Sequence, residues 1–157
     1  MSIDQAEFRR IMGHFASGVT VVTVCREGTC HGITVSSFCS LSLEPPLVLI
    51  CIDRRYTSHE KIQQSEAFAI NILAEDGEWL SRHFASRDDD KFAKVGYHTG
   101  ESGAPLLDEA LATIECRLVD QFPGGDHTIF VGQVLAMSAQ DEGRPLLYFR
   151  SGYHKLG

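Results

Sequence analysis

The chain has 157 residues, of which 43% are hydrophobic and 22% are charged. This balance is typical of one soluble globular domain and excludes a disordered chain, a fibrous repeat and a large multidomain architecture. The 14 basic and 21 acidic residues give a net charge of −7 and are interspersed, so we expect no general nucleic-acid or acidic-membrane surface. We predict a single domain over residues 1–157.

The N-terminal segment has a helical pattern. Apolar residues recur at intervals of three and four from Phe8 to Ala16, and Asp4 and Glu7 have the spacing of a capping box. This pattern predicts an amphipathic helix that ends near Gly18. The first ten residues contain no apolar run, and no window approaches the roughly 18 apolar residues of a membrane span. We therefore expect a cytoplasmic protein without a membrane segment.

The next part of the chain reads as three strands. The β-branched run Val19–Cys25, the turn-like residues 26–29 and the apolar run Cys30–Val35 predict a hairpin. Two prolines, Pro45 and Pro46, then break the chain before Leu47–Ile52. This six-residue apolar run is too short for a helix and predicts a strand buried on both faces.

The middle of the chain mixes helix and strand. Thr57 and Glu60 have capping-box spacing and predict a short helix to about Ser65, and Phe68–Leu73 reads as a strand. Leu80–Phe84 suggests a second short helix.

The last third reads as a loop followed by strands. Residues 96–105 contain three glycines and predict a surface loop. The alternating residues 112–118, the turn Pro123–Asp126 and the run His127–Ala139 predict a second hairpin, and Leu146–Phe149 predicts a closing strand.

Six or seven strands joined mainly by hairpins do not form the regular strand–helix alternation of a parallel sheet, so we expect an antiparallel closed barrel. The five cysteines are an odd set without a C-x-x-C motif, and four of them lie in strand-like apolar runs. This pattern predicts buried, reduced thiols. The seven histidines have spacings unlike those of metal ligands, so we expect no metal site.

The chain lacks the glycine-rich dinucleotide and P-loop motifs, the zinc-protease motif and the nucleophile elbow. One segment, Gly32–Ser42, leaves a strand and is rich in hydroxyls. These hydroxyls could follow the polar edge of a planar ring, or they could bond only to the local backbone. Composition leaves both interpretations open.

Four segments together resemble one family. Gly32–Ser42 with the following Leu43–Leu49, the opening Phe8–Thr23, the segment Gly125–Gly132 and the segment Pro145–Phe149 are similar to the short-chain flavin reductases. These proteins are the reductase components of two-component flavin monooxygenases. The resemblance spans nearly the whole chain in the family's order. It implies an FMN-binding split barrel, a mainly β, antiparallel Greek-key barrel with a few short helices, which forms a homodimer and holds flavin near the subunit interface.

The resemblance also implies site residues. It places Thr34, Ser36 and Ser37 along the isoalloxazine and ribityl chain, and His127 and Tyr153 at the pocket of the nicotinamide. The flavin would also meet Cys51, Asp53, Arg54, Ser58, Phe84, Ala85 and Arg87. On chemical grounds alone, Arg54 or Arg55 and the helix amides near Ser58 could bind a phosphate, although two adjacent arginines can equally be solvated.

The implied reaction is hydride transfer from NADH or NADPH to FMN or FAD. Because the two cofactors carry this chemistry, the protein needs no nucleophile or strong base, and its task is to stack and orient the rings. The reduced flavin would pass to a partner monooxygenase. Two alternatives remain open, namely a non-catalytic FMN-binding electron carrier and a flavin-dependent reductase of another acceptor such as a corrinoid.

Overall fold

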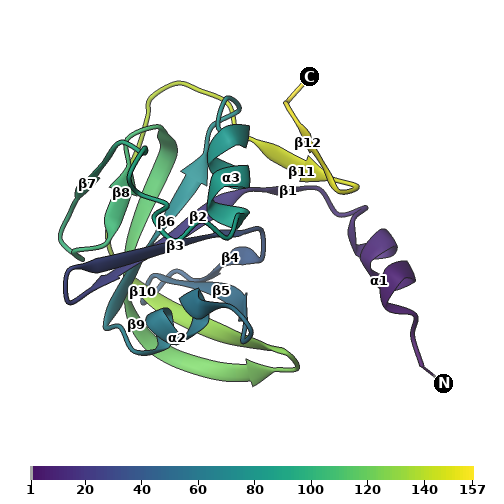
Figure 1. Ribbon diagram of the computed structural model, residues 1–157, viewed down its shortest axis with the longest axis horizontal. Coiled ribbons are helices and arrows are strands. Elements are labelled where there is room, and N and C mark those ends of the chain that lie inside the picture. The colour runs from purple at the N-terminus through teal and green to yellow at the C-terminus, as the bar shows by residue number, and fades with distance from the viewer. Residues whose placement is uncertain (1) are drawn as a thin grey trace.

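The computed structural model describes residues 2–157 and is built around one curled antiparallel sheet (Figure 1). Its strands are β2 (Thr20–Arg26), β3 (Thr29–Val35), β4 (Phe38–Ser42), β5 (Leu47–Asp53), β6 (Ala67–Leu73), β9 (Ala110–Gly124) and β10 (His127–Ala139). They are hydrogen-bonded in the order β3-β2-β6-β9-β10-β5-β4. The predicted antiparallel barrel and both predicted hairpins are confirmed.

The curled sheet encloses the main core. Its buried apolar side chains come from six of the strands and from the helix that follows β5, and they include Val22, Ile33, Ile50, Ile62, Phe68, Cys116 and Phe130. Strand β5 places Val48, Ile50 and Ile52 in this core, whereas Leu47, Leu49 and Cys51 are only partly buried. The prediction that this strand is buried on both faces is therefore wrong for the single chain.

In residues 2–157, three short helices lie outside the sheet: α1 (Gln5–Met12), α2 (Thr57–Gln63) and α3 (Glu78–Ala85). Asp4 caps α1 by accepting a hydrogen bond from the amide of Ala6. The helix ends at Met12 rather than near Gly18, because Ser17 and Gly18 instead form a strand. Figure 1 shows α1 standing away from the sheet.

The start of α2 also differs from the sequence prediction. Tyr56 occupies the N-cap position, and its side chain makes no capping hydrogen bond. Thr57 is the first residue of the helix, so the predicted capping box with Glu60 is wrong. Helix α3 is confirmed, and its buried residues Leu80 and Phe84 pack into a second apolar cluster.

Two small sheets complete the fold. Strands β1 (Ser17–Gly18), β11 (Leu147–Phe149) and β12 (Gly152–His154) form one, so the predicted closing strand near residue 147 pairs with β1 and β12 rather than with the barrel. Strands β7 (Tyr97–Thr99) and β8 (Pro105–Leu107) form the other. The predicted loop 96–105 thus contains β7 and ends at the first residue of β8.

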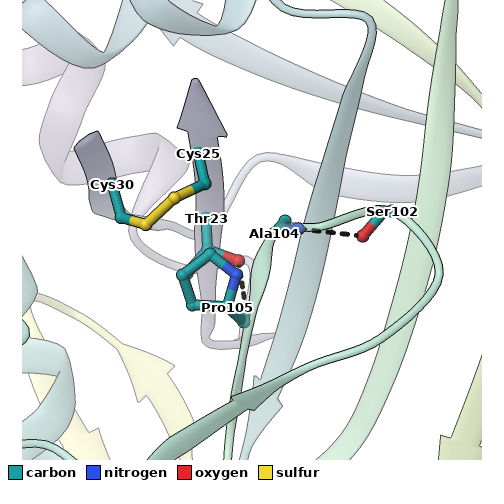
Figure 2. Close-up of a disulfide and its surroundings, with 6 residues drawn as sticks. All are labelled: Thr23, Cys25, Cys30, Ser102, Ala104 and Pro105. Atoms are coloured by element: carbon teal, nitrogen blue, oxygen red, sulfur yellow. Dashed lines mark hydrogen bonds between the residues drawn. A yellow bond between two sulfur atoms is a disulfide. The ribbon is translucent and has the colours of Figure 1, made fainter. Parts of the chain in front are cut away.

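Buried polar side chains explain why residues 105–107 are ordered. The amide of Leu107 donates to Oδ1 of Asn71 at 2.9 Å, and the hydroxyl of Thr23 donates to the carbonyl oxygen of Pro105 at 2.6 Å (Figure 2). Both side chains are fully buried. Because a buried polar group without a partner is costly, these bonds fix the segment against β2 and β6.

The cysteine prediction is wrong for one pair. Cys25 and Cys30 form a disulfide across the β2–β3 hairpin (Figure 2). Glu27 and Gly28 form the turn with positive φ angles of 53° and 80°, which places the two cysteines directly opposite each other. The free cysteines are Cys39, Cys51 and Cys116, and among them Cys116 alone is fully buried.

None of the helices in residues 2–157 combines the length and the apolar character needed to cross a bilayer.

Candidate functional site

A cavity of about 760 Å³ lies between strand β3 and the segments around helices α2 and α3. Three segments line it: residues 30–34 of β3, residues 55–58 at the start of α2, and residues 84–92 at the end of α3 and in the loop that follows. Five of the predicted site residues lie in its wall, and they are Thr34, Ser58, Phe84, Ala85 and Arg87.

The remaining predicted residues lie outside the lining of this cavity, and they are Ser36, Ser37, Cys51, Asp53, Arg54, His127 and Tyr153. Two of them form hydrogen bonds with residues in or next to the cavity wall: Asp53 with Arg55, and Tyr153 with Ser81.

Thr34 and Tyr153 are connected through Ser81 of α3. The hydroxyl of Thr34 donates to the carbonyl oxygen of Ser81 at 2.6 Å. The hydroxyl of Ser81 lies 2.6 Å from the phenol oxygen of Tyr153, and the guanidinium of Arg82 lies 5.0 Å from the centre of the Tyr153 ring. Ser81 is fully buried. These contacts join β3, α3 and β12 on one side of the cavity.

Ser37 and Cys51 fasten the exit of β3 to β5. The hydroxyl of Ser37 donates to the carbonyl oxygen of Cys51 at 2.8 Å, and the amide of Cys51 donates to the carbonyl oxygen of Ser37 at 3.1 Å. The Ser37 hydroxyl therefore bonds to the backbone of the neighbouring strand β5, 14 residues along the chain, rather than to backbone close to it in sequence. Burial and the neighbouring Cys39 raise the pKa of the Cys51 thiol, which keeps it neutral.

Asp53 fixes Arg55 at the cavity. The backbone amide of Arg55 and its guanidinium both donate to the Asp53 carboxylate, with a shortest contact of 2.7 Å. These hydrogen bonds lower the pKa of Asp53 to about 2, and the charge of Arg55 and the nearby His127 add to the effect. The Asp53 carboxylate is thus ionised and engaged, and it is Arg55 that lines the cavity.

Arg54 supports the turn that carries His127. Its guanidinium donates to the carbonyl oxygen of Gly125, and its amide donates to the carbonyl oxygen of Asp126 at 3.1 Å. His127 begins β10, and its Nδ1 lies 2.7 Å from a carboxylate oxygen of Asp126. Polar atoms of Asp53, Asp126 and His127 all lie within 4.8 Å of one another. The Asp53–Arg55 ion pair and the turn that carries Asp126 and His127 therefore lie next to each other.

The apolar part of the cavity wall is aromatic. The rings of Phe84 and Phe92 meet edge to face with their centres 5.2 Å apart. A Cβ atom on Gly32 would lie 2.7 Å from the Phe84 ring, so glycine is required for this close approach. Phe84 also has no exposed surface, which makes it part of the core as well as of the wall.

Most of the lining was not among the predicted site residues, and three of the residues missed carry side chains with a clear chemical character. His31 and Phe92 lie in the wall, and so does Lys91, whose ammonium donates to the carbonyl oxygens of Phe84 and Gly32. Burial and the charges of Lys61 and Lys91 lower the pKa of His31. No local sequence pattern marks these residues, because Lys91 and Phe92 come from a loop and reach β3 only through the tertiary fold.

Comparison with known proteins gives one family over most of the chain. Residues 12–157 match the family model described as "Flavin reductase like domain". The reductase component of a 4-nitrophenol 4-monooxygenase/4-nitrocatechol 2-monooxygenase from Rhodococcus opacus is 45% identical over 151 residues, which cover 96% of this chain and 80% of that protein. A flavin reductase from Pseudomonas putida is 37% identical over 97% of this chain and 90% of that protein.

Solved structures have the same fold. An NADH:FAD oxidoreductase from Streptomyces globisporus, in complex with NAD and FAD fragments, is 38% identical and superposes with a TM-score of 0.95 over 98% of this chain and 93% of that chain. The nitrilotriacetate monooxygenase component B from Mycobacterium thermoresistibile is 40% identical, also with a TM-score of 0.95, over 98% of this chain and 87% of that chain.

Proposed function

The chain belongs to the family of flavin reductase-like domains, and we infer from this membership that it is an NAD(P)H:flavin oxidoreductase. It transfers hydride from a reduced nicotinamide nucleotide to FMN or FAD and supplies reduced flavin to a monooxygenase. The observation that carries this function is the cavity, in which Thr34, Ser58, Phe84, Ala85 and Arg87 come together from three separate segments.

The chemistry of the cavity wall fits a flavin nucleotide. Phe92, which packs on the buried Phe84, offers an apolar surface for a ring system, the hydroxyls of Thr34 and Ser58 offer polar contacts, and Arg87 offers a cation for a phosphate. Bound flavin supplies the hydride acceptor. The protein's part is to hold the ring in place and to exclude competing orientations.

We assign His127 to the nicotinamide side of the site. Its Nδ1 is engaged by Asp126, which leaves Nε2 as the ring nitrogen that can meet a substrate. The bonds from Arg54 to Gly125 and Asp126 hold the turn in position. His127 therefore acts by orienting the dihydronicotinamide, and a proton transfer is not needed for hydride to move.

We further propose that the protein is a homodimer, and that α1 contributes to the interface. The apolar side chains of α1, namely Phe8, Ile11 and Met12, are exposed, and Phe15 just beyond the helix is 80% exposed. Exposed apolar surface of this kind is typical of association sites. A second copy is the occupant that the family's architecture favours. Small-angle scattering in solution checks this proposal, and a monomeric mass would contradict it.

Steady-state oxidation of NADH and NADPH tests the enzymatic function. The purified chain is assayed with each nucleotide, with and without added riboflavin, FMN or FAD. We expect turnover that depends on flavin with at least one nucleotide. A chain that binds FMN but gives no flavin-dependent turnover with either nucleotide would be an electron carrier instead.

A further inference from the structure

Lys91 is a partly buried cation in the wall of the cavity. Its Nζ donates to the carbonyl oxygen of Phe84 at 2.8 Å and to the carbonyl oxygen of Gly32 at 3.2 Å. An ammonium group carries three donors, and within residues 2–157 these two carbonyls are the only acceptors it meets. One N–H of Lys91 is therefore available to a ligand.

The charge of Lys91 is not neutralised by an ion pair. Among the described residues, no carboxylate lies within 4.0 Å of its Nζ. Burial lowers the pKa of Lys91, and the more distant Asp88 acts in the opposite direction. A partly desolvated ammonium without a counterion is unfavourable, and an anionic ligand would offset that cost.

The other cations of the cavity differ from Lys91 in this respect. Arg55 is ion-paired with the buried carboxylate of Asp53 at 2.7 Å. Arg87 is exposed and precedes Asp88 and Asp89, whose carboxylates also lie in the cavity lining. Lys91 is the one of these three cations that is both partly buried and unpaired.

We propose that Lys91 binds a phosphate group of the flavin nucleotide through its remaining N–H. This proposal rests on the proposed function, since it requires flavin in this cavity. The two carbonyl bonds hold the ammonium in place, so little side-chain freedom is lost on binding. The residue thereby favours FMN and FAD over riboflavin, which has the same ring and ribityl chain but no phosphate.

The test compares riboflavin, FMN and FAD as substrates of the wild type and the Lys91→Met variant, with NADH or NADPH saturating. Removing a charge-assisted hydrogen bond should raise the KM for FMN and FAD about tenfold. The KM for riboflavin and the kcat with all three flavins should stay within about twofold of the wild type. Lys94→Met, at an exposed lysine three residues on, is the matched control and should change none of these values.

A second variant covers a loss of folding in Lys91→Met. Lys91→Gln keeps two N–H donors for the carbonyls of Phe84 and Gly32 but removes the charge, and it should show the same selective rise in KM. An equal loss for all three flavins would mean that Lys91 only fixes the wall, and an unchanged KM for FMN would exclude a phosphate contact. A wild type inactive with every flavin would instead overturn the proposed function.

Discussion

The buried hydroxyl of Ser81 lies 2.6 Å from the phenol oxygen of Tyr153, while the carbonyl oxygen of Ser81 accepts a hydrogen bond from Thr34. A single residue of α3 therefore connects the cavity wall in β3 with the C-terminal sheet. Because Ser81 has no exposed surface, loss of either partner leaves a polar group without water to replace it.

A double-mutant cycle measures the bond between Ser81 and Tyr153. Ser81→Ala and Tyr153→Phe each remove one end of it, and we expect each to lower the free energy of unfolding by about 1 kcal/mol. The double variant should lose little more than either single variant, since the bond can be lost only once. Urea unfolding of the four proteins gives the values. Fully additive losses would mean that the two hydroxyls do not interact.

His127→Ala separates the nicotinamide side of the site from the flavin side. We expect the rate of NADH oxidation at saturating flavin to fall about tenfold, or about 1.4 kcal/mol of transition-state stabilisation. The Kd of the flavin should not change, because His127 lies outside the cavity lining.

His98→Ala is the matched control, since His98 also lies 2.7 Å from an aspartate, in this case Asp108. Its side chain is exposed and lies outside the flavin cavity. We expect no change in turnover for this variant. A comparable loss in both variants would remove the assigned role of His127.

The ion pair of Asp53 and Arg55 predicts an acid-side loss of stability. The pKa of Asp53 falls from 3.8 to about 2 in the folded chain, chiefly through hydrogen bonds from Arg55. A lowered carboxyl pKa stabilises the fold above pH 3.8, and this contribution is lost as the pH falls through about 2. Arg55→Met should flatten the pH dependence of the unfolding free energy in this window. A pH profile identical to that of the wild type would contradict the assignment.

The disulfide predicts a thiol count. Of the five cysteines, three should react with a thiol reagent in the denatured, unreduced chain, and all five should react after reduction. Replacing Cys25 and Cys30 together by serine should lower the free energy of unfolding by about 2 kcal/mol, since the closed loop is short. Five reactive thiols without reduction would show that the bond does not form in solution.

The barrel strands were predictable because their composition determines them locally. The β-branched run of β2 and the apolar run of β5 favour a strand whatever the connection that follows them, because each has an apolar face to bury in the core. The pairing of Cys25 with Cys30 also had a signal in the sequence, because a two-residue turn at Glu27-Gly28 places them opposite each other. The odd cysteine count obscured it.

Other features depend on tertiary contacts that no local pattern encodes. Strands β7 and β8 are three residues each, and β8 is fixed by bonds to the distant Asn71 and Thr23. Five predicted flavin contacts line the cavity, but Lys91 and Phe92 could not be placed there, since a loop brings them to β3. The resemblance to the family was based on particular sequence segments, and Lys91 and Phe92 lie outside all of them.

The proposed activity requires that the protein holds flavin while a nicotinamide nucleotide delivers hydride to it. The direct test is anaerobic mixing of a catalytic amount of the chain with free FMN or FAD and a molar excess of NADH or NADPH over the flavin, with the visible absorption of the flavin as the signal. We expect bleaching of the whole flavin pool at a rate proportional to protein concentration. Bleaching no faster than in the protein-free mixture, with both nucleotides and both flavins, would contradict it.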